Sequence, residues 1–81
     1  MNTYYFTFGS SELYPYRYGW VEIQAPNERT ARDVYRLYYP DKVGGFLNCA
    51  FVYGSEFEKT AMYRGEYGDK CHARIRFEEV G

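Results

Sequence analysis

The residue types best suited to chemistry in this chain of 81 residues are concentrated in one short segment, residues 13–20. That segment combines four aromatic rings and one guanidinium with a proline and a glycine. Tyrosine, tryptophan and arginine dominate binding hot spots because they supply large contact areas at low entropic cost. The segment therefore predicts a surface for a partner or ligand, made by Tyr14, Tyr16, Arg17, Tyr18 and Trp20. The alternative is a lid, in which two or three of these rings fold back and only close a small core.

A second candidate lies on a predicted helix. Arg29, Arg32 and Arg36 recur at i, i+3 and i+7, which places three guanidinium groups along one stripe. Each could hold a carboxylate or a phosphate through paired hydrogen bonds. The alternative is a solvated face, with Glu28 paired to Arg32 and Asp33 paired to Arg29 or Arg36.

Catalytic signatures are missing from the sequence. The single histidine, His72, falls on a predicted strand where Cys71 points to the opposite face, so the two make a poor Cys–His dyad. Two cysteines and one histidine are too few for a zinc site, which needs about four ligands. The paired glutamates fit a helix start and a charged tail better than an acid–base pair. We therefore expect no enzyme, no cofactor and no metal.

Composition narrows the function further. Aromatic residues make up 22% of the chain, eleven of them tyrosines, and so small a core cannot bury them all with their hydroxyls satisfied. The net charge of −1 argues against both a strongly basic nucleic-acid binder and an acidic DNA mimic. There is neither a signal-peptide pattern nor an apolar run of the roughly 20 residues that span a membrane. We expect a cytoplasmic protein with two free, buried thiols.

The elements that must position these residues begin with a β-hairpin. Residues 3–8 alternate in polarity and predict the first strand, and residues 20–25 predict the second. In the second strand Val21 and Ile23 should face the core, and Trp20 should face outward. The tyrosine-rich segment lies at the hairpin tip, where Pro15 and Gly19 interrupt regular pairing.

Downstream, a helix is predicted over residues 27–39, capped by Asn27 and stopped by Pro40. Its sheet-facing residues should be Ala31, Val34, Tyr35 and Tyr38. Residues 46–53 are apolar on both faces, which predicts a strand in the middle of a sheet or beneath a second layer. Ser55 and Glu58 have the spacing of a capping box and predict a short helix to about residue 62.

The last predicted strand covers residues 71–77. Its apolar face should carry Cys71, Ala73, Ile75 and Phe77, opposite a basic face. The order β-β-α-β-α-β predicts a single α+β domain over residues 1–81. We expect a two-layer sandwich in which one main helix and one short helix accompany a four-stranded, mostly antiparallel sheet.

Two other ligands fit the residue types. An aromatic ring stacks on a base while arginine holds phosphate, which would suit a nucleotide. An open sheet face could take single-stranded RNA, although the element order is not that of RNA-recognition sheets. The residues concerned would be Tyr5, Trp20, His72, Arg74 and Arg76.

Several landmarks resemble small proteins encoded by phages and prophages of Gram-positive bacteria, a group mostly without known function. They are residues 4–9 (YYFTFG), residues 19–26 (GWVEIQAP), the Ala31–Arg32 pair, residues 51–53, Glu56–Phe57 and Arg64–Gly65. The likeness covers most of the chain and carries over no functional residue, and the tyrosine-rich tip is not part of it.

The resemblance implies a phage context, in which small proteins often block host defence. We therefore expect an anti-defence protein that acts in the cytoplasm of an infected bacterium by stoichiometric binding. Its first expected target is a host defence protein, an effector component of a CRISPR–Cas system. The alternatives are a sponge for a defence signalling nucleotide, or a small RNA-binding module. The exposed aromatic hairpin would also suit a homodimer.

Overall fold

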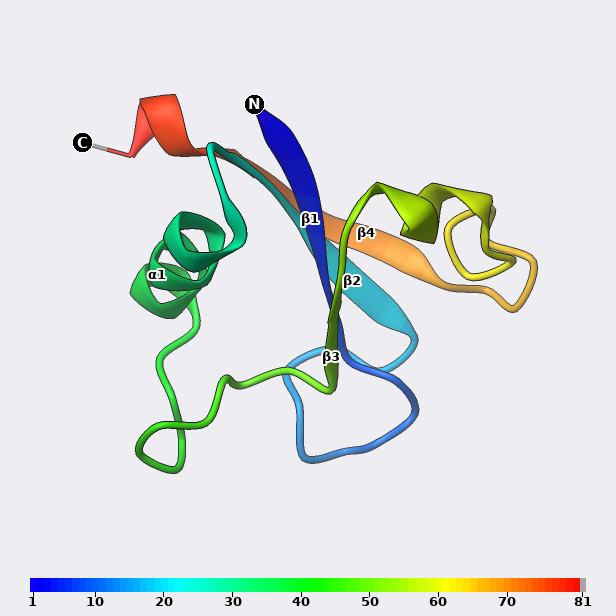
Figure 1. Cartoon of the computed structure of the whole chain (residues 1–81). Coiled ribbons are helices and arrows are strands. Elements are labelled where there is room, and N and C mark those ends of the chain that lie inside the picture. Colours follow the sequence, from blue (N-terminus) through cyan, green and yellow to red (C-terminus); the bar gives the residue numbers. More distant parts are fainter. Residues whose placement is uncertain (81) are drawn as a thin grey trace.

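One four-stranded sheet organises the molecule (Figure 1). The structure is a computed structural model and describes residues 1–80. The strands lie in the order β3-β1-β2-β4; β1 pairs antiparallel with β2 and β3, and β2 runs parallel to β4. The predicted α+β class, with a mostly antiparallel sheet and one main helix, is confirmed. The elements are β1 Asn2–Thr7, β2 Gly19–Ala25, α1 Glu28–Tyr38, β3 Phe51–Tyr53, η1 Ser55–Lys59, β4 Lys70–Arg76 and η2 Phe77–Glu79, where η is a 3₁₀ helix.

Helix α1 begins where the sequence predicts. The Asn27 side chain accepts a hydrogen bond from the backbone N–H of Thr30 at 2.8 Å, which satisfies one of the free donors of the first turn. Ala31, Val34 and Tyr35 face the sheet as expected, but Tyr38 is exposed. The expectation for Tyr38 was wrong because the next residue takes its place: Tyr39 leaves the helical path and stacks on Tyr35, with ring centroids 5.0 Å apart.

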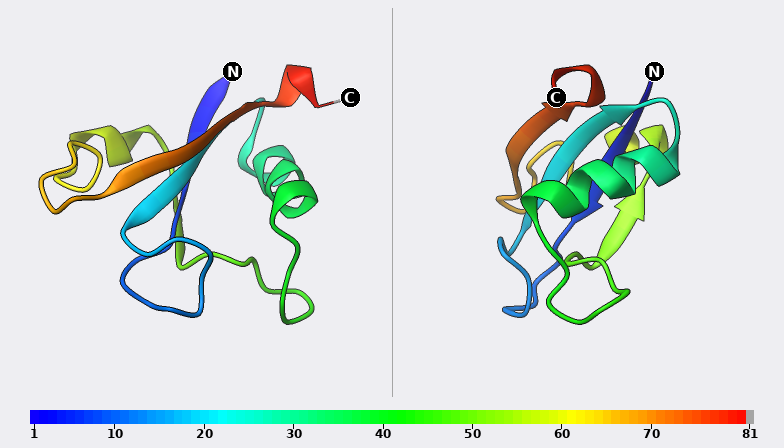
Figure 2. Two further views of the ribbon diagram at one scale, coloured as in Figure 1. Left: turned by 180° about the vertical axis from the view of Figure 1, so that it is seen from behind. Right: turned by 90° about the vertical axis from the view of Figure 1, so that its left-hand side faces the viewer.

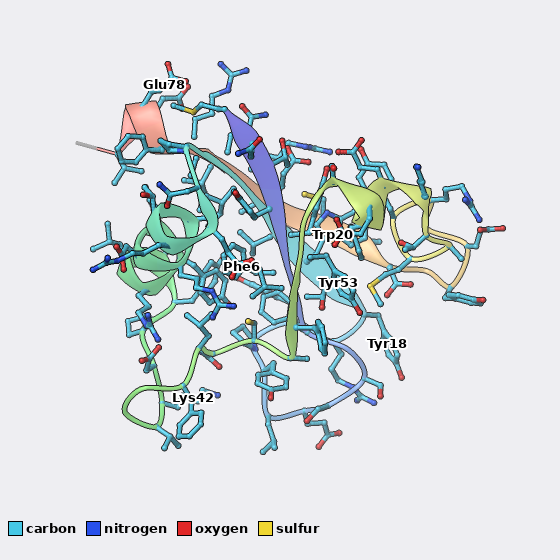
Figure 3. The ribbon with its side chains drawn as sticks, in the orientation of Figure 1. Phe6, Tyr18, Trp20, Lys42, Tyr53 and Glu78 are labelled. Carbon is cyan, nitrogen blue, oxygen red and sulfur yellow. The ribbon has the colours of Figure 1, made fainter. Side chains whose placement is uncertain are left out.

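The sheet is covered on both faces (Figure 2). Helix α1 packs on one face, where Phe6 stacks on Tyr35 with ring centroids 4.4 Å apart. On the other face η1 and the turn after it cover a second cluster, formed by Tyr5, Trp20 and Phe57. Trp20 is only 4% exposed, so the expectation that it faces outward is corrected (Figure 3). Its ring meets Phe57 edge to face at 5.4 Å, because the chain folds back over this side of the sheet.

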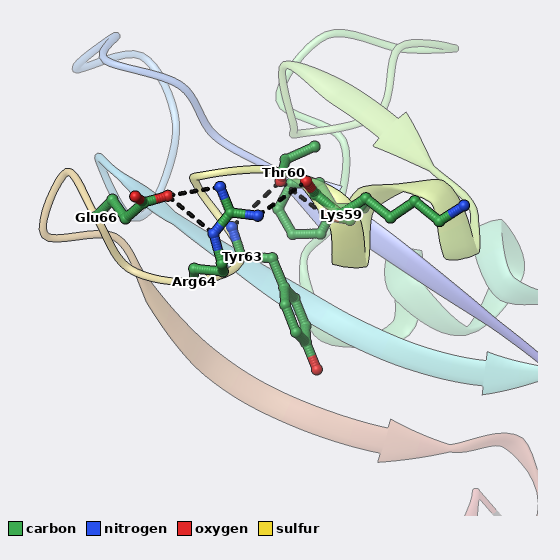
Figure 4. Close-up of polar contacts among 6 residues, drawn as sticks. Lys59, Thr60, Tyr63, Arg64 and Glu66 are labelled. Atoms are coloured by element: carbon green, nitrogen blue, oxygen red, sulfur yellow. Dashed lines mark hydrogen bonds and ion pairs between the residues drawn. The ribbon is translucent and has the colours of Figure 1, made fainter.

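Polar contacts stabilise η1 and the turn after it, the segment that we call the second cover of the sheet (Figure 4). Arg64 pairs with Glu66 at 2.7 Å and donates to the backbone carbonyl of Lys59 at 3.1 Å. Thr60 joins the two ends of the turn, since its hydroxyl accepts from the backbone N–H of Tyr63 and donates to the Phe57 carbonyl. The ring of Tyr63 closes over Trp20 at a centroid distance of 5.8 Å.

The capping box expected at Ser55 and Glu58 does not form, and the segment is a 3₁₀ helix that ends at Lys59. Gly54 occupies the cap position, where it has no side chain to accept from the first turn, and its own backbone N–H donates to the Glu56 carboxylate at 2.9 Å. Glu58 is turned toward the sheet instead, where its carboxylate accepts a 2.6 Å hydrogen bond from the Tyr5 hydroxyl. Glu58 thus forms a charge-assisted hydrogen bond with a buried tyrosine and does not cap the short helix.

The third strand is shorter than predicted. Only Phe51–Tyr53 pair with β1, at one edge of the sheet, and residues 46–50 form a loop. The alternative of a strand beneath a second layer is the correct one, because Val52 packs on the helix side and Tyr53 on the η1 side. The loop is held to the helix by the Tyr35 hydroxyl, which donates to the Asn48 carbonyl at 2.7 Å.

The last strand departs from strict alternation. The register between β2 and β4 shifts after Trp20, so His72 is an extra residue in β4. As a result Cys71 joins the cluster under η1, while Ala73 and Ile75 pack on the helix side. The predicted common face was therefore wrong at Cys71, and also at Phe77, because the strand ends at Arg76 and Phe77 begins η2 as an exposed residue.

The second cluster should carry a measurable share of the stability. Phe57 is fully buried, so Phe57→Ala should lower the free energy of unfolding by about 3–5 kcal/mol through lost burial and the cavity left behind. Urea denaturation followed by tyrosine and tryptophan fluorescence measures the change. Phe46→Ala removes the same atoms from an exposed position and should cost less than about 0.5 kcal/mol. Equal losses in the two variants would contradict this placement.

Candidate functional site

Two loops project from the same end of the molecule (Figures 1 and 2). The loop between β1 and β2 carries the tyrosine-rich segment, and the loop between α1 and β3 carries residues 39–50. Lys42, labelled in Figure 3, links them, since its ammonium group donates to the Leu13 carbonyl at 3.0 Å. The loops therefore form one surface.

A groove begins between these loops and continues beside helix α1 and the start of β3. It consists of two adjoining hollows of about 510 and 500 Å³, which share Tyr14, Phe46 and Leu47 as walls. Volumes of this size lie in the range of ligand pockets. We call the two together the loop groove. The first hollow is completed by Glu12, Leu13, Lys42, Val43 and Asn48, and the second by Arg32, Arg36, Gly45, Cys49, Ala50, Phe51 and Val52.

The groove brings together parts of both predicted sites. Tyr14 comes from the tyrosine-rich segment, and Arg32 and Arg36 come from the helix stripe. Arg29 shares the stripe in sequence but does not line either hollow. The structure thus separates three arginines that the sequence treated as equivalent.

Both groove arginines are held by ion pairs on one side. Arg32 donates from Nε to Glu28 at 2.9 Å, as predicted, and Arg36 donates from Nε to Asp41 at 3.1 Å. The sequence predicts that Asp33 pairs with Arg29 or Arg36, but Arg36 pairs with Asp41 instead. Within residues 1–80 the Nη atoms of these two arginines donate no hydrogen bond, and Arg29 forms no ion pair. The two guanidinium groups are therefore held in place through Nε, and their Nη donors remain available to a ligand.

The tyrosine-rich segment is divided between a lid and an exposed surface. Tyr14 is half-buried against the helix-side core. Tyr16 stacks on His72, with ring centroids 4.1 Å apart, and meets Phe8 edge to face at 5.7 Å. The His72 ring occupies the space that a Cβ at Gly19 would need, so glycine is required there. Tyr14 and Tyr16 thus close the end of the core.

Arg17 and Tyr18 face solvent. Arg17 pairs with Glu12 at 3.2 Å and lies 5.5 Å from the centre of the Tyr18 ring. Tyr18 has a left-handed backbone with φ of 58°, a conformation that non-glycine residues seldom adopt. Trp20, the last predicted member, lies buried under η1 and is not accessible to a partner.

Burial of Trp20 also removes the sheet platform considered for RNA. Tyr5 is buried in the same cluster, so neither ring can stack on a base. Arg74 and Arg76 remain exposed farther along the sheet, and Arg74 lies 3.7 Å from the Glu22 carboxylate.

Sequence reasoning missed the apolar rim of the groove. Four large side chains there are between 62% and 73% exposed: Leu13, Val43, Phe46 and Phe51. A signal was present at Gly44–Gly45, because two glycines between Val43 and Phe46 predict a tight turn with both neighbours at its tip. Gly45 adopts φ of 85°, and the backbone N–H of Phe46 donates to the Val43 carbonyl at 3.1 Å.

The floor of the groove contains a thiol. Cys49 is free and buried, as expected, whereas Cys71 is free but only half-buried. Burial raises the pKa of Cys49 from the usual 9.0 to about 11, against the lowering effect of Arg32 and Arg36. Cys49 is therefore a neutral thiol at physiological pH and a poor nucleophile.

Comparison of the chain with family models, with curated proteins and with solved structures gave no match. Among residues 1–80 no helix has the length and apolar character needed to cross a membrane. The same residues contain no group of three or more potential metal ligands. The loop groove is therefore the candidate binding site.

The raised pKa of Cys49 can be tested by alkylation. In a Cys71→Ser variant at about pH 8, iodoacetamide should modify folded protein roughly a hundredfold more slowly than protein unfolded in urea, because the pKa values differ by about two units. Mass spectrometry measures the rates. The folding free energy contributed by the neutral thiol should be complete below about pH 9 and disappear as the pH rises toward 11. Folded and unfolded rates within threefold of each other would contradict a buried neutral thiol.

Proposed function

We propose that this protein is not an enzyme and acts by stoichiometric binding of another protein through the loop groove. The observation that carries the proposal is the rim of four exposed apolar side chains around the groove, Leu13, Val43, Phe46 and Phe51. Contiguous apolar surface on a small protein costs solubility and typically marks an interaction site. Arginine and tyrosine within the same groove are the other residue types that dominate protein interfaces.

The phage resemblance supplies the context for this proposal. A small protein that covers a functional surface of a host defence protein needs no catalytic residue, only a compact scaffold and a binding face. We therefore propose a host defence protein as the partner, and an effector component of a CRISPR–Cas system as the first target to test.

A nucleotide sponge is the second candidate. The observation in its favour is the second hollow, where Tyr14 and Phe46 could flank a base and Arg32 could hold a phosphate. A protein partner accounts for more of the surface, because a ligand confined to the second hollow would leave uncovered Leu13 and Val43, which line only the first.

Stoichiometry tests the proposed function. Purified Cas effector complexes are incubated with increasing amounts of the protein, and cleavage of target DNA is measured. We expect inhibition that is complete near an equimolar ratio and does not grow with incubation time. Inhibition by trace amounts that increases with time would indicate catalysis and contradict the proposal. Native mass spectrometry of the free protein should show a monomer, since a homodimer closed over the groove would hide the binding face.

A single substitution in the rim should abolish this inhibition. Phe46→Ser removes an exposed anchor and should weaken binding by about 2 kcal/mol or more, the loss typical of a hot-spot residue, while the melting temperature stays nearly unchanged. The control is Tyr67→Ser, an aromatic residue that is 76% exposed and lies outside the groove. Full inhibition by the Phe46 variant, or equal loss in both variants, would contradict the assignment.

A further inference from the structure

We infer that the loop groove is built for an acidic segment of its partner, one that carries an aliphatic or aromatic anchor next to carboxylates. The inference rests on the proposed function and names the chemistry that the groove would recognise. The anchor of the bound segment would lie among Tyr14, Phe46 and Leu47, and the carboxylates of that segment would pair with Arg32 and Arg36.

The state of the two arginines is the first reason. Each guanidinium is fixed through Nε, by Glu28 for Arg32 and by Asp41 for Arg36, which leaves the Nη donors of both without a hydrogen bond within residues 1–80. A guanidinium oriented by one carboxylate loses less conformational entropy when it binds a second. Two such groups one helical turn apart suit two carboxylates on one segment.

The distribution of charge along the groove is the second reason. The second hollow has two arginines and no acidic residue among its walls. In the first hollow Glu12 is balanced by Arg17, whereas Lys42 donates to the Leu13 carbonyl and pairs with no carboxylate within residues 1–80. Each hollow therefore offers positive groups to a bound segment: the Nη donors of Arg32 and Arg36 in the second, and the Lys42 ammonium in the first.

The form of the groove is the third reason. The two hollows share Tyr14, Phe46 and Leu47 and therefore lie next to each other, whereas a small-molecule site is usually a single pocket that encloses most of its ligand. Leu13 and Val43 line the first hollow, Phe51 lines the second and Phe46 lines both, so these side chains would contact a chain that passes from one hollow to the other. An extended peptide segment fits such a shape better than a nucleotide does.

The floor of the first hollow adds a polar contact point. Asn48 is 9% exposed and lines this hollow, and its side-chain oxygen Oδ1 is buried with no hydrogen-bond partner within residues 1–80. A buried acceptor without a donor is costly. A small rotation of the side chain would let it accept from a backbone N–H of a bound segment.

A peptide titration tests the inference. The probe is a ten-residue peptide of alternating glutamate and leucine with one central phenylalanine, and its control replaces every glutamate with glutamine. Each is added to ¹⁵N-labelled protein up to millimolar concentration, and NMR follows the Nε–H signals of Arg32 and Arg36 and the backbone signals of residues 46–49. We expect the acidic peptide to shift these signals and the glutamine peptide to bind about tenfold or more weakly.

Three variants serve as matched controls. Arg32→Gln and Arg36→Gln should each weaken binding of the acidic peptide several-fold, and the pair together about tenfold or more. Arg29→Gln removes the same charge from the same helix outside the groove and should change affinity less than about twofold. The ¹⁵N spectrum of each variant shows whether it is folded.

Several results would overturn the inference: no shift with the acidic peptide, equal binding of the glutamine peptide, or equal loss with Arg29→Gln. ADP is tested in parallel, and shifts at Arg32 and Arg36 with ADP but not with the peptide would favour a nucleotide. Two further outcomes distinguish the acidic segment from the proposed function. Cleavage inhibition that needs Phe46 but tolerates Arg32→Gln with Arg36→Gln would leave it standing and remove the acidic segment. Peptide binding without inhibition of any effector would support the acidic segment and contradict the proposed function.

Discussion

The need to cover both faces of the central β1–β2 pair is the constraint on which the structure depends. Strand β1 presents Phe6 toward the helix and Tyr5 toward η1. Strand β2 presents Val21 and Ile23 toward the helix and Trp20 toward η1. A single helix can cover only one face. The chain therefore folds back after β3, and the bond from the Tyr5 hydroxyl to Glu58 fixes that fold at 2.6 Å. With the two faces closed in this way, four of the large apolar side chains that remain exposed line the loop groove: Leu13, Val43, Phe46 and Phe51.

Local patterns in the sequence predict most of the fold. The first hairpin, the Asn27 cap, the helix and the basic final strand all follow from periodicity and capping chemistry, which depend on neighbours within a few residues. The second cover is harder to predict because it depends on contacts distant in sequence. A strand residue such as Trp20 has the same local pattern whether its outer face meets solvent or a returning segment, and only Phe57, which comes after a third strand, decides between them. Likewise the register shift at His72 follows from its partner strand and has no local signal.

The candidate site was predicted in parts and not as a whole. Aromatic residues near arginine pointed to a binding surface, and Tyr14 with Arg32 and Arg36 does line the groove. Sequence spacing alone could not join the hairpin to the helix, because the segment that brings them together, residues 39–50, was partly assigned to a strand. Once the Tyr35 hydroxyl holds the Asn48 carbonyl at 2.7 Å, this segment lies beside the hairpin tip and supplies Phe46 and Leu47 as shared walls.

The Gly44–Gly45 turn has a consequence for how such a surface could change. Val43 and Phe46 stand on a turn whose glycines have open space around them, and neither side chain packs in the core. Replacing these two residues would alter what the groove recognises with little effect on folding. Selection for a new partner and selection for a stable sheet would then act on separate residues. The same separation would make the turn a practical place to graft other side chains and retarget the scaffold.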